Sequence, residues 1–111
     1  MRHKVATLVG STKLEWQERY ALVNRELTLT GYVVISVGIF RGHVPNIESY
    51  RDLLESIHFQ KIDMADLVVL IHRNAIGIHT RLELDYAKKM DKPIFVFDET
   101  TKDLLPFKEI S

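Results

Sequence analysis

The chain has 111 residues, of which 46% are hydrophobic and 27% charged, with 15 basic residues, 15 acidic residues and no cysteine. This composition predicts one globular domain, residues 1–111, that is located in the cytoplasm. The balanced charge argues against binding to a nucleic-acid duplex, and the missing cysteines exclude disulfides and cysteine nucleophiles. Because every apolar run is shorter than the roughly 20 residues that cross a bilayer, we expect no membrane partner.

The N-terminal part of the chain predicts a strand followed by a helix. Val5–Val9 is apolar without alternation, which indicates a buried strand rather than a signal peptide. Helical periodicity follows from Lys13 to Thr30, and Thr12 and Glu15 have the spacing of a capping box for that helix. The predicted buried stripe of the helix consists of Trp16, Tyr20, Val23 and Leu27.

A second strand and helix are predicted for the middle of the chain. Residues 32–37 form the strand, and a helix is expected from about Ile47 to Met64. Its predicted apolar stripe consists of Tyr50, Leu53, Leu54, Ile57 and Ile62. Arg41 lies in the loop between strand and helix, where it either closes over a ligand or is simply solvated.

The third unit is the most informative segment. Asp66–Ile71 predicts a buried strand, and the loop 72–79 leads to a helix that is expected to begin at Thr80. A fourth strand is predicted at Pro93–Phe97, and the tail 98–111 has too little pattern to assign.

Strands that alternate with helices predict an α/β protein with a flavodoxin- or Rossmann-like three-layer sandwich. We expect a parallel sheet of about four strands in the order 2-1-3-4, with helices on both faces. In that order the loops after the first and third strands, Gly10–Lys13 and Asn74–Thr80, meet at the switch point where open sheets bind ligands.

Glu83 is the candidate reactive group of this crevice. A carboxylate held by a rigid helix beside a pocket can act as a nucleophile or a general base. Thr80 and Glu83 also have capping-box spacing, so Glu83 can instead serve only to cap its helix.

The loop Gly10-Ser11-Thr12, with Lys13 beside it, is the candidate anion site. The amides of a helix N-terminus, two hydroxyls and a lysine suit a phosphate or carboxylate. The dinucleotide and Walker fingerprints are absent, and a simple strand end with a helix cap explains the loop equally well. The spacing of the five histidines predicts no metal site, and no cofactor is expected.

The chain resembles the nucleoside 2-deoxyribosyltransferase-like superfamily over residues 4 to about 97. The likeness rests on GST after the first strand and on two further patterns. They are His-x-x-Lys-Ile-Asp-x-Ala-Asp at His58–Asp66 and Ile-Gly-x-x-Thr-Arg-x-Glu-x-x-Tyr-Ala at Ile76–Ala87. Within the superfamily, the most similar branch is a small one, related to 2-deoxynucleoside 5-monophosphate N-glycosidases.

This resemblance implies a double-displacement mechanism at an N-glycosidic bond. Glu83 would attack C1′ of the sugar, the base would leave, and another base or water would resolve the glycosyl-enzyme. Gly10-Ser11-Thr12 would hold the 5′ end of a nucleoside or nucleotide, and Thr80 and Arg81 would contact it from the opposite wall. Gly77 and His79 are further candidate substrate-binding residues on that wall. The resemblance also implies a homodimer or higher homo-oligomer.

Two departures from the family pattern bear on activity. His58 stands where these enzymes usually have an aspartate, and it is either the acid that protonates the leaving base or a half-buried residue of the second helix. Before Glu83, Gly77 is followed by Ile78 and His79 where the small branch often has glutamate and serine.

Gly77-x-x-Thr80-x-x-Glu83 also partly resembles the GGxGTxxE loop of nucleotide phosphoribohydrolases of the lysine-decarboxylase-like group. The leading hypothesis is therefore a deoxyribosyltransferase or N-glycosidase acting on a nucleoside or nucleotide. The alternatives are a catalytically inactive nucleotide-binding or sensing module and an interaction protein that retains only the fold.

Overall fold

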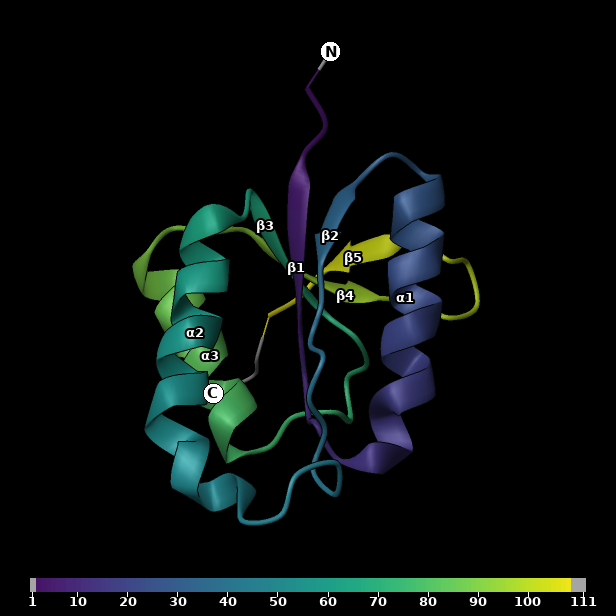
Figure 1. The fold of residues 1–111 in the computed structure, drawn as a ribbon. Helices are drawn as coiled ribbons and strands as arrows, with labels where there is room; N and C mark the ends of the chain where they lie inside the picture. Colours follow the sequence, from purple (N-terminus) through teal and green to yellow (C-terminus); the bar gives the residue numbers. More distant parts are fainter. Residues whose placement is uncertain (1, 109–111) are drawn as a thin grey trace.

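The computed structural model describes residues 2–108, so the first residue and the last three residues of the predicted domain and tail lie outside the described part. The described residues form one five-stranded sheet in the order β2-β1-β3-β4-β5 (Figure 1). The predicted α/β class and the strand order 2-1-3-4 are confirmed. In this part of the chain, no helix has the length and apolar character needed to span a membrane.

The elements have the following bounds. The strands are β1 (Val5–Val9), β2 (Val33–Ile35), β3 (Leu67–Leu70), β4 (Ile94–Phe97) and β5 (Leu104–Pro106). The helices are α1 (Gln17–Leu29), α2 (Arg51–Met64) and α3 (Ile78–Lys89). Short 3-10 turns, η1 (Leu14–Trp16) and η2 (Ile47–Tyr50), precede α1 and α2.

The sheet is parallel except at one edge. β1 pairs in parallel with β2 and β3, and β3 pairs in parallel with β4. β5, which was not predicted, pairs antiparallel with β4 and places Leu104 opposite Phe97. Pro106 lies in this edge strand, where its missing N–H removes no hydrogen bond from the centre of the sheet.

The two faces of the sheet are covered by different helices (Figure 1). Leu67 and Val69 of β3 share a buried cluster with Tyr20, Val23 and Leu27 of α1. The alternate residues Val68 and Leu70 pack with side chains of the other two helices, namely Ile62, Leu84 and Ala87. Period-two alternation along a strand that is buried on both faces produces this division and the three predicted layers.

The apolar stripe predicted for α2 is wrong in most positions. Ile62 is buried as expected, but Leu53 is 56% exposed and Ile57 is 39% exposed. α2 instead contacts α3 through Phe59 and Tyr86, whose stacked ring centroids are 4.4 Å apart. This contact turns the expected stripe toward solvent.

The capping box predicted at Thr12 and Glu15 is also wrong. A 3-10 turn occupies residues 14–16, and α1 begins only at Gln17, without a side-chain cap. The Ser11 hydroxyl instead accepts a hydrogen bond from the Lys13 amide at 3.3 Å. The crevice loop is therefore separated from α1 by an extra turn.

Candidate active site

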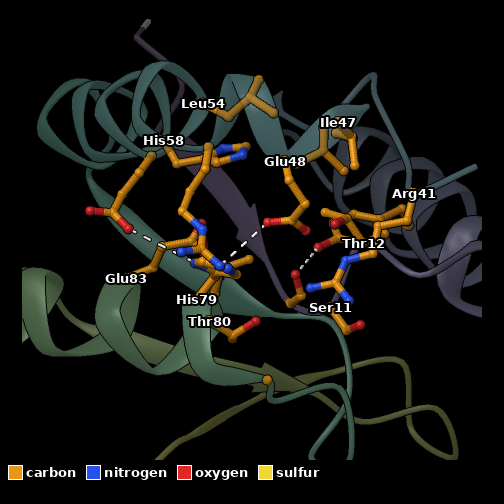
Figure 2. Close-up of a pocket in the computed structure, with 17 residues that line it drawn as sticks. Ser11, Thr12, Arg41, Ile47, Glu48, Leu54, His58, His79, Thr80 and Glu83 are labelled. Carbon is orange, nitrogen blue, oxygen red and sulfur yellow. Dashed lines mark hydrogen bonds and ion pairs between the residues drawn. The ribbon is translucent and has the colours of Figure 1, made fainter. Parts of the chain in front are cut away.

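A pocket opens at the carboxyl ends of β1 and β3, at the predicted switch point (Figure 2). Its walls are the loop after β1, the loop between β2 and α2, the pocket side of α2 and the start of α3. The cavity volume is about 100 Å³. That is less than the roughly 300–1,000 Å³ of typical ligand pockets, so this pocket encloses a group of about sugar size and leaves the rest of a larger ligand at its open mouth.

Backbone contacts hold the loops of the pocket together. The Ser11 amide donates to the Ala75 carbonyl at 2.8 Å, which joins the loops after β1 and β3. The Arg41 amide donates to the Thr12 carbonyl at 2.9 Å and brings in the loop after β2. These loops are distant in sequence, so the fixed shape of the pocket depends on the assembled sheet.

Gly10 allows the loop after β1 to approach the core closely. A Cβ atom at this position would lie 2.8 Å from Cγ1 of Ile71 and 3.2 Å from the Tyr20 hydroxyl oxygen. The Tyr20 hydroxyl donates to the Gly10 carbonyl at 2.8 Å. A side chain at residue 10 would therefore collide with Ile71, the residue after β3, and with the tyrosine that supports the loop.

Glu83 lies in the interior of α3, and the predicted capping box is wrong here too. α3 begins at Ile78, two residues before Thr80, and its N-cap is Gly77, which provides no side-chain cap. Glu83 is therefore beyond the turn in which a carboxylate caps amides. It is 7% exposed and lines the pocket. A buried carboxyl without a capping role supports the alternative interpretation, that Glu83 serves a bound ligand.

Burial changes the acidity of Glu83. Its pKa is raised from 4.5 to about 8, chiefly by desolvation, while Lys61 lowers the pKa and the negative charge of Glu55 raises it. Burial also lowers the pKa of Lys61, which the Glu83 carboxylate partly restores. The Lys61 ammonium donates to the Ser36 carbonyl at 3.2 Å, which anchors it at the end of β2. Lys61 is thus the cation that favours the charged form of Glu83.

Two histidines line the same part of the pocket as Glu83. Desolvation lowers the pKa of His58 from 6.5 to about 4, with further contributions from Lys61 and His79. His79 lies on α3, and its Nδ1 atom is 3.9 Å from Oε2 of Glu55 on α2. At neutral pH, His58 is therefore an uncharged ring, while His79 has a carboxylate neighbour.

The pocket has two chemically different ends (Figure 2). His58, His79 and Glu83 lie toward one end. Ser11, Thr12 and Arg41 lie together at the other end, where they provide two hydroxyls and a guanidinium. The first end can carry out acid, base or nucleophile chemistry, and the second can bind an anion.

Most of the residues predicted for the site come together. Those that line the pocket are Gly10, Ser11, Thr12, His58, Gly77, His79, Thr80 and Glu83. Two predicted binding residues, Lys13 and Arg81, are exposed and lie outside the pocket lining. The anion end therefore depends on the hydroxyls and on Arg41 rather than on Lys13.

Sequence analysis did not find the α2 wall of the pocket. Arg51, Leu54, Glu55 and His58 line it, and of these only His58 was predicted as a site residue. A signal was present, because residues spaced i, i+3, i+4 and i+7 share one helix face. That face is mostly polar, whereas the predicted buried stripe of this helix consists of apolar residues only.

The positive end of a helix lies at a different place from the one predicted. α1 begins at Gln17, away from Gly10–Thr12. α3 begins beside Gly77, a pocket residue, and the first amides of a helix have no partners within it. The positive helix end that was expected beside the loop after β1 is therefore that of α3, on the opposite wall of the pocket.

Fold and site together define a flavodoxin-like α/β protein with a ligand pocket at its switch point. The sequence matches no family model and no curated protein sequence. Among solved structures the chain is similar to the CMP N-glycosidase BcmB of Clostridium botulinum, with a TM-score of 0.60 and 18% identity. The similarity covers 84% of this chain and 70% of that chain. The chain thus shares its fold with this N-glycosidase, as the resemblance in its sequence implied.

Proposed function

We propose that the protein cleaves or transfers the N-glycosidic bond of a nucleotide, with Glu83 as the nucleophile. The observation that carries this proposal is a buried carboxyl, freed from any capping role, that lines an open pocket at the switch point of the sheet. The similar fold of a CMP N-glycosidase supports the substrate class.

The proposed reaction has two steps. The Glu83 carboxylate attacks C1′ of the sugar, and the bond from C1′ to the base nitrogen breaks with its electron pair passing to the base. Water or a second base then attacks C1′ and releases the carboxylate, so that the configuration at C1′ is retained. Positive charge develops on the sugar in both transition states, and it favours the ionised form of a carboxyl whose pKa burial has raised to about 8.

The anion end of the pocket suits a 5′-phosphate. Ser11 and Thr12 provide hydroxyl donors, and Arg41 can donate a pair of hydrogen bonds to phosphate oxygens. The first amides of α3 add positive potential from the other wall. Arg41→Ala is expected to raise KM for a nucleotide more than for the corresponding nucleoside, which steady-state kinetics on both substrates would measure.

A substrate panel tests the proposal. Deoxy- and ribonucleosides and their 5′-monophosphates are incubated overnight, with and without an acceptor base, and released base is quantified by chromatography. Wild type and the exposed-residue control Glu18→Gln are expected to turn over at least one nucleotide, and Glu83→Gln is expected to lose at least about 10³-fold in rate. Equal rates for wild type and Glu83→Gln would rule out Glu83 as the nucleophile.

The second candidate is a nucleotide-binding or sensing module without catalysis. The raised pKa of about 8 favours this function, because Glu83 is then mostly protonated at neutral pH and loses its proton only when a bound ligand favours the carboxylate. A thermal-shift screen with the same panel separates the two functions. Nucleotide binding that survives Glu83→Gln, together with no turnover by the wild type, identifies a binding module.

Size-exclusion chromatography tests the predicted homo-oligomer.

A further inference from the structure

His79 and Glu83 share one face of α3. They are separated by four residues, which places their side chains one helical turn apart, about 5–6 Å between Cβ atoms. Both side chains line the pocket, with Glu83 buried and His79 41% exposed. The histidine is therefore the more exposed of the two pocket residues.

Glu55 lies beside the His79 ring. Its Oε2 atom is 3.9 Å from His79 Nδ1, and it belongs to the neighbouring helix α2. Because Nδ1 is the nitrogen near Glu55, Nε2 on the other side of the ring is the atom that can face a ligand.

His58 is the competing candidate for the acid, as the sequence suggested. Its pKa is lowered to about 4 by desolvation, by Lys61 and by His79 itself. At neutral pH a ring with this acidity has already lost its proton. It can form hydrogen bonds with a substrate, but as a neutral ring it is too weak an acid to protonate a leaving base.

We propose that His79, beside Glu55, is the general acid that protonates the leaving base, a role that rests on the proposed function. As C1′ bonds to the Glu83 carboxylate and the glycosidic bond breaks, the electron pair moves into the base. The proton of His79 Nε2 goes to a nitrogen or oxygen of that base, and His79 becomes neutral. In hydrolysis the neutral ring takes a proton from the attacking water, so His79 and Glu83 both return to their starting states.

A comparison of leaving groups tests this role. The natural substrate is the best nucleotide from the panel, and the second substrate carries the same sugar phosphate on 4-nitrophenol, which leaves as a phenolate without needing a proton. His79→Gln is expected to lose about 10²–10⁴-fold on the nucleotide, the usual contribution of a general acid, and less than about 3-fold on the nitrophenyl substrate. Glu83→Gln is expected to lose activity on both substrates.

Controls separate the possible failures. His3→Gln, a matched change at an exposed histidine far from the pocket lining, is expected to behave as wild type. Equal losses of His79→Gln on both substrates would indicate a structural role and overturn the assignment, as would full activity on the nucleotide. Either result leaves the proposed function intact if Glu83→Gln is inactive. Absence of turnover by the wild type on every substrate overturns the proposed function and this assignment together.

Discussion

The two faces of the sheet differ in what they bury. On the α1 face, the buried cluster is apolar apart from the Tyr20 hydroxyl, which donates to the Gly10 carbonyl. On the face covered by α2 and α3, an apolar cluster built on Ile62 and Leu84 stops at the pocket, where buried Glu83 and half-buried Lys61 take over.

This difference separates stability from chemistry. Burial of apolar side chains against α1 stabilises the fold, because each such side chain contributes roughly 1.5–3 kcal/mol. A buried carboxyl with a pKa raised to about 8 acts in the other direction once it ionises. The apolar packing against α1 therefore offsets the cost of ionising Glu83 on the other face of the sheet.

The sharpest test of this separation is Leu27→Ala on α1. Leu27 is 3% exposed within the α1 cluster, so its truncation is expected to lower the free energy of unfolding by about 2–5 kcal/mol. Turnover per folded molecule is expected to stay unchanged, because Leu27 is outside the pocket lining. Denaturant titration measures the first effect, with Leu29→Ala, a change at a 76% exposed leucine of the same helix, as the control. A large loss of turnover in the folded variant would show that the faces are coupled.

Gly10→Ala is expected to affect both stability and ligand binding. Gly10 lines the pocket and is packed closely against Ile71 and Tyr20. The new Cβ atom would meet Ile71 and the Tyr20 hydroxyl, at a cost of about 1–3 kcal/mol. It would also move the loop that carries Ser11, so nucleotide affinity is expected to fall along with stability. Gly38→Ala is the control, because a Cβ atom there meets nothing within 4 Å. Equal stability of the two variants would contradict the close packing described for Gly10.

Glu83 is expected to make stability depend on pH. Its pKa is about 8 in the folded protein against 4.5 ordinarily, so the folded state holds its proton more tightly than the unfolded state. The resulting stabilisation is complete below pH 4.5 and is lost as pH rises through about 8, with a slope of about 1.4 kcal/mol per pH unit. His58 has the opposite effect between about pH 4 and 6.5.

The window from pH 6.5 to 8 therefore isolates Glu83. Across it, wild type is expected to lose about 2 kcal/mol relative to Glu83→Gln, an order-of-magnitude figure that denaturant titration at several pH values would measure. Glu18→Gln, an exposed matched change, is expected to follow wild type. Parallel stability curves for wild type and Glu83→Gln would mean that the carboxyl has an ordinary acidity.

The smallest expected effect concerns Lys61. Replacement by Met removes the cation that lowers the pKa of Glu83, so this pKa is expected to rise further. The rate of base release should then reach its plateau at a higher pH than in wild type. A pH–rate profile of both proteins measures the shift. An unchanged profile would show that Lys61 acts only through its hydrogen bond to the Ser36 carbonyl.

The sequence by itself determined the architecture and the place of the site. Unbroken apolar runs at the first and third strands are possible only where both faces of a strand are covered, so they implied parallel central strands. Their order then placed Gly10–Thr12 and the segment before Glu83 at one edge, as the structure confirms.

Only the tertiary structure decided which side chains surround Glu83 and how its helix begins. Apolar periodicity showed that α2 is a helix, but packing of Phe59 on Tyr86 set its rotation and turned Glu55 and His58 toward the pocket. Local spacing suggested a capping box for Glu83, whereas α3 begins two residues earlier. Burial and long-range charges then raised its pKa, and these quantities do not exist until the helices pack.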